Sequence, residues 1–170
     1  MLGYISLERR GDGDRILANL AQDLVARGVA LVGMVHNGTS RGTCEMVLRL
    51  LPDGPEMALS QPMEAGSDVC ALDPGALEQV VVGVERQLEV ASLQTGLPAL
   101  MILNKFGKQE AAGRGCRGLI ARALALGVPV LLSVPPETRA AFDAFTDGLA
   151  EEIAPDPAAL RQWLVRVGVV

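Results

Sequence analysis

Continuous apolar runs alternate along this chain with segments in which apolar residues recur at helical spacing. The runs at 29–35, 98–103 and 128–134 are short and almost unbroken, which is typical of strands covered on both faces. A further apolar run at 2–7 has the composition of a first strand. Helical spacing predicts helices over 15–27, from Pro74 to about Leu93, over about 111–126, over 137–149 and over 157–167.

Two β-like runs flank the turn residues Pro52-Asp53-Gly54-Pro55, so the segment at about 45–60 is predicted to be a hairpin at a sheet edge. Helices that alternate with apolar strands imply an α/β fold, a three-layer sandwich around a mostly parallel sheet. We expect the strand at 98–103 to be central in this sheet. A length of 170 residues fits a single α/β domain, 1–170.

Composition and charge argue against several classes of function. Hydrophobic residues make up 49% of the chain and charged residues 21%, as in a folded globular protein. The net charge of -5 provides no basic surface for a polyanion, which disfavours nucleic acid as a partner. No apolar stretch reaches the roughly 18 residues of a membrane span, and the N-terminus lacks a signal-peptide pattern. We therefore expect a cytoplasmic protein with no membrane insertion.

Polar segments follow the predicted strands at 8–14, 36–43, 104–115 and 133–137. Open parallel sheets bind their ligands beyond the carboxyl ends of the strands. The residues that carry the chemistry of this protein are therefore expected in these four segments.

The first loop, residues 8–14 (ERRGDGD), has the glycines of a phosphate-binding loop without its other residues. A Walker A motif requires Gly-Lys-Ser/Thr where this chain has Gly13-Asp14-Arg15, and a dinucleotide fingerprint requires glycine where Ile16 stands. We expect Asp12 and Asp14 to cap the following helix. The alternative is a modified anion-binding loop whose charge comes from Arg9, Arg10 or Arg15.

The lysine loop, residues 104–115 (NKFGKQEAAGRG), contains both lysines of the chain. All other basic residues except His36 are arginines, so the pairing of Lys105 with Lys108 favours an anion site here. Ammonium groups bind phosphate or a tetrahedral oxyanion such as molybdate. The alternative is a solvated loop at a helix start. The candidate ligand-binding residues of this loop are Asn104, Lys105, Gly107, Lys108 and Arg114.

Asn104 and Lys105 match the guanine-recognition motif of GTPases only in part, because that motif has aspartate where this chain has Gly107, and the absence of a Walker A lysine upstream argues against a GTPase as well. The stretch "NKFGKQE" resembles instead the "DE-x-G-x-x-E" strand end of small nucleoside-triphosphatases related to thermostable archaeal and bacterial enzymes. Gly107 and Glu110 match that pattern, whereas Asn104 and Lys105 replace its two acids. By this resemblance, the strand that ends at Asn104 lies beside the first strand. Loss of both acids removes the usual Mg²⁺ ligand and the activator of water.

Several further motifs resemble a bacterial family of unknown function whose genes accompany molybdate-transport operons. They are "LPDGP", "LSQ" (59–61), "GSDVCALDPGALEQ" (66–79), "LNKFGKQEAAGRG" (103–115) and "FDAFTDGLAEEIAPDPAALRQWL" (142–164). The resemblance implies a layout similar to P-loop NTPases, including the protein that helps to make the guanine-dinucleotide form of the molybdenum cofactor. It also implies a role in molybdenum uptake or cofactor handling.

Several single residues have two interpretations each. His36 is either a structural histidine or a donor to a ligand. Glu110 either caps a helix and pairs with a cation, or acts as a base or metal ligand. Cys44, Cys70 and Cys116 form a metal site with His36 only if the fold brings them together, and separate buried thiols are the commoner arrangement.

Two functions from different classes remain. The first is a nucleotide- or oxyanion-binding accessory protein without standard Walker motifs. The second is a divergent Mg²⁺-dependent phosphohydrolase that uses Glu110 or an acid of the first loop. The cofactor or ligand is accordingly Mg²⁺ with a nucleotide, or molybdate. A small anionic ligand is the expected partner, and the sequence also allows a molybdenum-pathway protein and a second copy of the chain.

Overall fold

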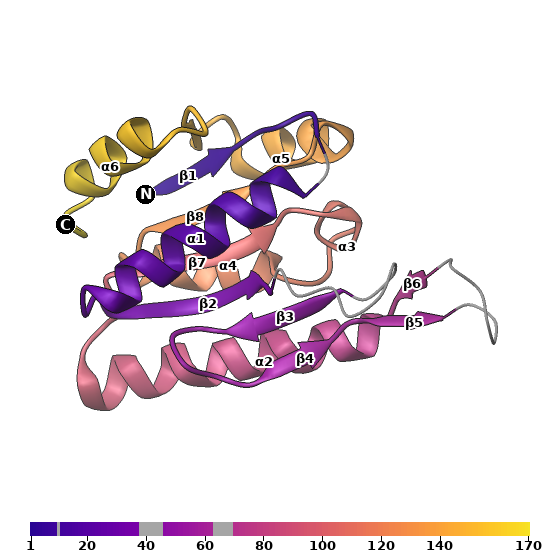
Figure 1. Cartoon of the computed structure of the whole chain (residues 1–170), viewed down its shortest axis with the longest axis horizontal. Coiled ribbons are helices and arrows are strands. Elements are labelled where there is room, and N and C mark those ends of the chain that lie inside the picture. Colours follow the sequence, from indigo (N-terminus) through magenta and orange to yellow (C-terminus); the bar gives the residue numbers. More distant parts are fainter. Residues whose placement is uncertain (10, 38–45, 63–69) are drawn as a thin grey trace.

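A computed structural model of the protein describes residues 1–9, 11–37, 46–62 and 70–170 (Figure 1). Its large sheet contains β1 (Leu2–Ile5), β2 (Leu31–His36), β3 (Val47–Leu50), β4 (Glu56–Ala58), β7 (Leu100–Lys105), β8 (Val130–Ser133) and β9 (Glu151–Glu152). The lateral order of these strands is β4-β3-β2-β7-β8-β1-β9. A separate small sheet pairs β5 (Ser60–Pro62) with β6 (Cys70–Leu72) in antiparallel orientation.

Most of the large sheet is parallel. Strand β2 pairs with β7, β7 with β8, β8 with β1 and β1 with β9, all in parallel orientation. The hairpin of β3 and β4 adds two antiparallel strands at one edge. The predicted α/β class, the mostly parallel sheet, the central position of β7 and the edge hairpin are therefore confirmed.

Strand β8 separates β7 from β1: Val130 pairs with Met101 on one side and with Leu2 on the other. The prediction that the strand ending at Asn104 lies beside the first strand is therefore wrong. An apolar run indicates that a strand is buried, but it carries no information on lateral order. A crossover connection can pass over one strand and leave room for another to pair there later.

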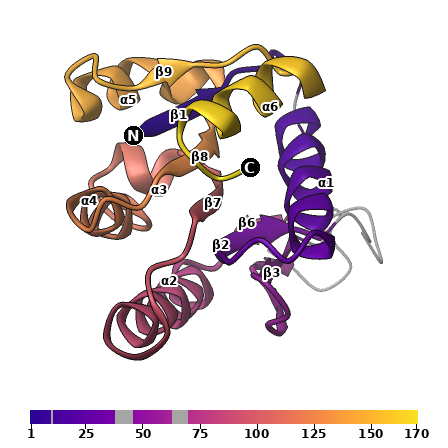
Figure 2. The ribbon, with the colours of Figure 1, turned by 90° about the vertical axis from the view of Figure 1, so that its left-hand side faces the viewer.

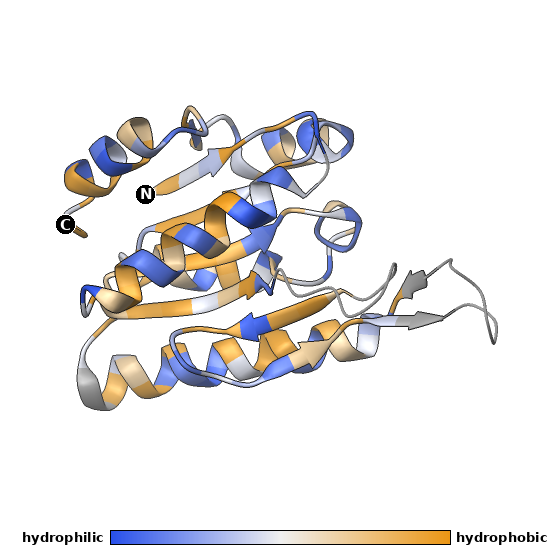
Figure 3. Cartoon of the chain, viewed as in Figure 1, coloured by the Kyte–Doolittle hydropathy of each residue, from blue (hydrophilic) through white to orange (hydrophobic). Residues whose placement is uncertain are grey.

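Helices cover both faces of the large sheet (Figure 2). Helices α1 (Asp12–Ala26) and α6 (Pro157–Arg166) pack on one face, and α2 (Pro74–Val90), α4 (Arg117–Ala125) and α5 (Arg139–Thr146) pack on the other. Successive residues of β7 enter opposite cores, with Met101 on the α2 face and Ile102 on the α1 face. Figure 3 shows this layering as hydrophobic strands between helices that are hydrophilic along parts of their surface.

The helix predicted over about 111–126 is present as α4, which begins only at Arg117, and a separate short helix, α3 (Lys108–Ala111), precedes it. Gly113 and Gly115 lie between them with φ of +85° and +58°, a left-handed conformation that glycine adopts readily and that ends a helix. Two short turns complete the chain: η1 (Ala91–Thr95) extends α2, and η2 (Pro136–Thr138) precedes α5. Among the described residues, no helix has both the length and the apolar character needed to cross a membrane.

Helix α1 begins after Gly11, which has φ of +85°. No side chain makes a capping hydrogen bond at this start of the helix. Asp12 pairs with Arg15 instead, with 3.6 Å between Oδ1 and Nη2. The prediction that Asp12 and Asp14 cap this helix is therefore wrong, because the chain enters through a glycine and the capping position carries no side chain. Gly13 permits a close approach to β8, since a Cβ there would lie 2.9 Å from the Cβ of Ser133.

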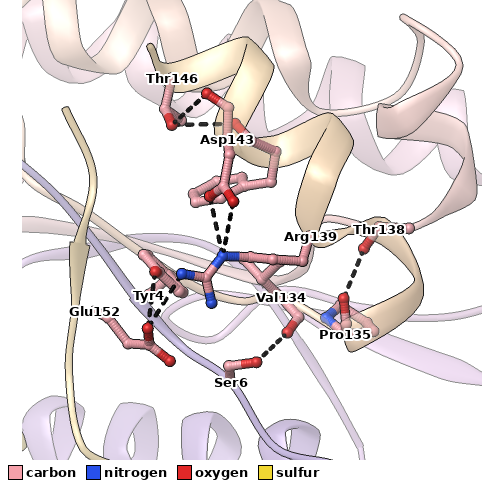
Figure 4. A network of polar contacts seen from close by, with 10 residues as sticks. Tyr4, Ser6, Val134, Pro135, Thr138, Arg139, Asp143, Thr146 and Glu152 are labelled. Atoms are coloured by element: carbon pink, nitrogen blue, oxygen red, sulfur yellow. Dashed lines mark hydrogen bonds and ion pairs between the residues drawn. The ribbon is translucent and has the colours of Figure 1, made fainter. Parts of the chain in front are cut away.

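Side chains hold the short edge strand β9 and helix α5 against β1 (Figure 4). The guanidinium of Arg139 lies over the Tyr4 ring, 4.6 Å from its centroid, and its Nε donates to Asp143 at 2.9 Å. Arg139 Nη2 and the Tyr4 hydroxyl both donate to Glu152 Oε2, each at 3.1 Å. These contacts fix the edge of the sheet that is opposite the hairpin.

Candidate functional site

The first loop and the lysine loop line one cavity of about 520 Å³ beyond the carboxyl ends of β1, β7 and β8. We call it the outer cavity. Parallel strands end at the same edge of a sheet, so loops distant in sequence meet there. The sequence presents the two loops as competing anion sites, whereas the fold makes them walls of one cavity. The polar and glycine residues of the lining are Glu8, Arg9, Gly11, Gly13, Asp14, Lys105, Gly107, Lys108, Ser133 and Glu137.

Phe106 anchors the lysine loop in the hydrophobic core. Its ring is fully buried and lies 5.1 Å from the ring of Phe142 and 5.6 Å from that of Phe145, measured between centroids. Its N–H donates to the Ser133 carbonyl at 2.9 Å, and its carbonyl accepts from Thr138 Oγ1 at 2.6 Å. These ring contacts and backbone hydrogen bonds fix the position of Phe106. The backbone of the neighbouring Lys105, at the end of β7, is therefore fixed as well.

Glu110 closes the lysine loop on itself. Its side chain is 4% exposed, and its Oε2 accepts the Gly107 N–H at 2.8 Å while its Oε1 accepts the Cys116 N–H at 3.0 Å. The first bond is a helix-capping contact at the start of α3. Burial, and the carboxylate of Glu110 beside it, raise the pKa of the Cys116 thiol well above its usual range, so this thiol stays protonated at neutral pH.

The two lysines have no ion-pair partner among the described residues, and Lys105 is half-buried while Lys108 is exposed. Arg9 lines the outer cavity as well. Arg114 is exposed, donates from Nε to Gln109 Oε1 at 3.0 Å and lines neither cavity of the site. Arg10 lies outside the described residues.

A smaller cavity of about 130 Å³, which we call the inner cavity, adjoins the outer one. The two share six lining residues, Asp14, Met46, Leu72, Lys105, Gly107 and Lys108. Apolar side chains from β2, β3, the residue between β4 and β5, α2 and the start of α4 form much of its wall: Met34, Leu48, Leu59, Leu77 and Cys116. His36, Asn104 and Glu110 also line it. A third cavity of about 360 Å³ lies between α1 and α6 and shares no residue with these two.

Asn104 and His36 meet at the ends of β7 and β2. The His36 N–H donates to Asn104 Oδ1 at 3.3 Å, and Ser133 Oγ donates to the Asn104 carbonyl at 2.7 Å. Cys116 is buried at the inner cavity, Cys44 lies outside the described residues, and the side chain of Cys70 in β6 also lies outside them. Among the described residues, no group of His, Cys, Asp and Glu side chains is arranged to hold a metal ion.

Residues 2–163 match a family described as "Protein of unknown function (DUF2478)". The chain belongs to the DUF2478 family. Over 155 residues this DUF2478 chain is 36% identical to "Molybdenum import ATP-binding protein ModC 2" of Bradyrhizobium diazoefficiens. The alignment covers 89% of the chain but 17% of that relative, so the chain spans less than a fifth of the relative's length.

Two solved structures resemble the DUF2478 chain over almost its full length. One is THEP1 from the hyperthermophile Aquifex aeolicus, with a TM-score of 0.64, 13% identity and coverage of 98% of this chain and 96% of that one. The other is a human cancer-related nucleoside triphosphatase, with a TM-score of 0.66, 15% identity and coverage of 96% and 93%. At such identities the likeness concerns the fold alone. It confirms the predicted P-loop-NTPase-like fold.

Some lining residues of the DUF2478 chain could not be recognised from the sequence. Met34 and Leu77 have the spacing of ordinary core residues, and nothing in the pattern distinguishes a side chain that faces a cavity from one that faces its neighbours. Asp14 was expected to cap α1, yet it lines both cavities. Ser133 and Glu137 lie in the segment 133–137 at the end of a predicted strand. Their place at a strand end is the feature of the sequence that could have identified them as lining residues.

Proposed function

We propose that this chain binds a nucleoside phosphate in the outer cavity and acts as an accessory protein in molybdenum uptake or cofactor handling. The observation that carries the proposal is the pair of lysines on the cavity wall. Lys105 and Lys108 have no ion-pair partner among the described residues, so a bound phosphate would supply the missing negative charge.

The size and charge of the outer cavity favour a nucleotide over a bare oxyanion. A volume of about 520 Å³ is in the range of cavities that enclose small organic ligands, and a four-oxygen anion would fill a small part of it. Glu8, Asp14 and Glu137 line the cavity together with the basic residues. Carboxylates repel an oxyanion but accept hydrogen bonds from sugar hydroxyls, so a nucleotide satisfies both kinds of lining group.

The link to molybdenum is supported by the relative from Bradyrhizobium diazoefficiens, whose name describes it as a molybdenum import ATP-binding protein. The resemblance of the sequence motifs to a family encoded with molybdate-transport operons points in the same direction. A protein of the molybdenum pathway is accordingly the proposed partner.

Binding without catalysis is the proposed activity, because the residues that a P-loop NTPase uses for catalysis are replaced. The first loop has Gly13-Asp14-Arg15 in place of Gly-Lys-Ser/Thr, and β7 ends in Asn104 and Lys105 in place of acids. The purified chain is expected to hydrolyse ATP and GTP no faster than a buffer control in a phosphate-release assay. A Mg²⁺-dependent turnover of about 1 per second that is lost in E110Q would establish a phosphohydrolase instead.

A thermal-shift panel of the full chain tests the proposed ligand class. The panel contains ATP, GTP, phosphate, molybdate and tungstate, each with and without Mg²⁺. We expect a nucleotide to raise the unfolding temperature more than any of the three inorganic anions, because a ligand that binds only the folded state stabilises it by mass action. A shift with molybdate and tungstate but not with nucleotides would contradict nucleotide binding and identify an oxyanion-binding protein.

A further inference from the structure

The inner cavity has features that phosphate binding does not explain. Its walls are largely apolar, and their apolar residues include Met34 from β2 and Leu77 from α2. The Asp, Glu and Lys residues of its lining are Asp14, Lys105, Lys108 and Glu110. Asp14, Lys105 and Lys108 are shared with the outer cavity, and Glu110 engages two backbone N–H groups. The space between these groups therefore suits an uncharged chemical group.

Asn104 directs a hydrogen-bond donor into this space. A backbone N–H can only donate, so the His36 N–H fixes the side-chain oxygen of Asn104 on its own side. The amide NH₂ of Asn104 then points the other way, and it has no acceptor among the described residues. Asn104 is 8% exposed and lines the inner cavity. The NH₂ keeps contact with solvent, since among the described residues the fully buried side-chain nitrogen and oxygen atoms without a partner are Gln87 Oε1 and Trp163 Nε1. A ligand that carries an acceptor there would bond this donor in place of water.

The lysines lie at the junction of the two cavities. Lys105, Lys108 and Gly107 line both, so one ligand can have its phosphate against the lysines while another part of it enters the inner cavity. We infer that the inner cavity is a base subsite: it takes the uncharged heterocyclic base of the bound nucleotide, with a ring nitrogen or carbonyl accepting from the Asn104 amide. This inference rests on the proposed nucleotide binding, and it excludes a bare oxyanion as the complete ligand.

Calorimetry with matched ligands and two variants of the full chain tests the base subsite. The ligands are the four common ribonucleoside triphosphates and inorganic tripolyphosphate, which has the phosphates and lacks the base. N104D keeps the oxygen that accepts from His36 and removes the donor, and L77F fills the cavity from α2. Circular dichroism and thermal unfolding show whether each variant is folded.

We expect the best nucleotide to bind wild type at least tenfold more tightly than tripolyphosphate. This ratio should fall below about threefold in both variants. Because it compares two anions, the ratio cancels the added negative charge of N104D. A ratio that stays at its wild-type value in folded N104D and L77F would overturn the base subsite and leave nucleotide binding in the outer cavity intact. Failure of every nucleotide and of tripolyphosphate to bind wild type would overturn both proposals.

Alkylation of Cys116 gives a second, spatial readout. This thiol lines the inner cavity, and its raised pKa leaves little of the reactive thiolate, so its slow reaction with N-ethylmaleimide is followed over hours at alkaline pH on the Cys116 peptide by mass spectrometry. A base bound in the inner cavity should slow this reaction further. We expect saturating nucleotide to slow the reaction at least fivefold and tripolyphosphate to change it less than twofold. Equal rates with the two ligands would place the base elsewhere.

Discussion

Replacement of either lysine, in K105A or K108A, is expected to weaken binding of the best nucleotide by about tenfold to a hundredfold. A charge-assisted hydrogen bond to an anion contributes roughly 1.5–3 kcal/mol, and each variant removes one such contact. Isothermal titration calorimetry measures the loss. The effect should be close to this full value because neither lysine has an ion-pair partner among the described residues that could offset it.

The R114A variant controls for a general loss of positive charge, and the R9A and R10A variants test the competing first loop. R114A removes a charge from the same loop, but Arg114 is bound to Gln109 and lines neither cavity, so its affinity should stay within about twofold of wild type. R9A and R10A remove the basic residues of the first loop. If the lysine variants bind like wild type while R9A and R10A lose affinity, the anion site belongs to residues 8–14 and the assignment to the lysine loop is wrong.

The sequence predicts the elements of this fold better than their arrangement. Each unbroken apolar run became a parallel strand, because burial on both faces leaves a signal in every residue of the run. The order of the strands leaves no such signal. Strand β8 pairs between β7 and β1, and its sequence does not differ in pattern from that of a strand at any other interior position. The break between α3 and α4 was visible only as Gly113 and Gly115, which helices also tolerate.

The same distinction applies to the candidate site. Lys105 and Lys108 could be located at a strand end from the sequence, since an apolar run followed by polar residues marks that end. Their meeting with the first loop depends on lateral order and could not be predicted. The inner cavity depends on the gap between β2, α2 and the start of α4, which is set by how whole elements pack. No local pattern encodes such a gap.

Loss of the Glu110 carboxylate, in E110A, is expected to lower the free energy of unfolding by about 3 kcal/mol. The substitution leaves the N–H groups of Gly107 and Cys116 without their acceptor, and Cys116 is buried. A buried backbone donor that loses its partner costs about 1–3 kcal/mol, and the two bonds are lost together. Urea denaturation followed by circular dichroism measures the change.

Two matched variants and a local probe separate this effect from a general one. E110Q keeps one acceptor oxygen and the side-chain volume, so it should lose less stability than E110A. E89A removes a carboxylate from the exposed face of α2 and should stay within about 0.5 kcal/mol of wild type. Hydrogen exchange should quicken in E110A across residues 106–116, because Glu110 joins the two ends of this segment. Unchanged exchange there, with wild-type stability, would show that Phe106 and its contacts hold the lysine loop without Glu110.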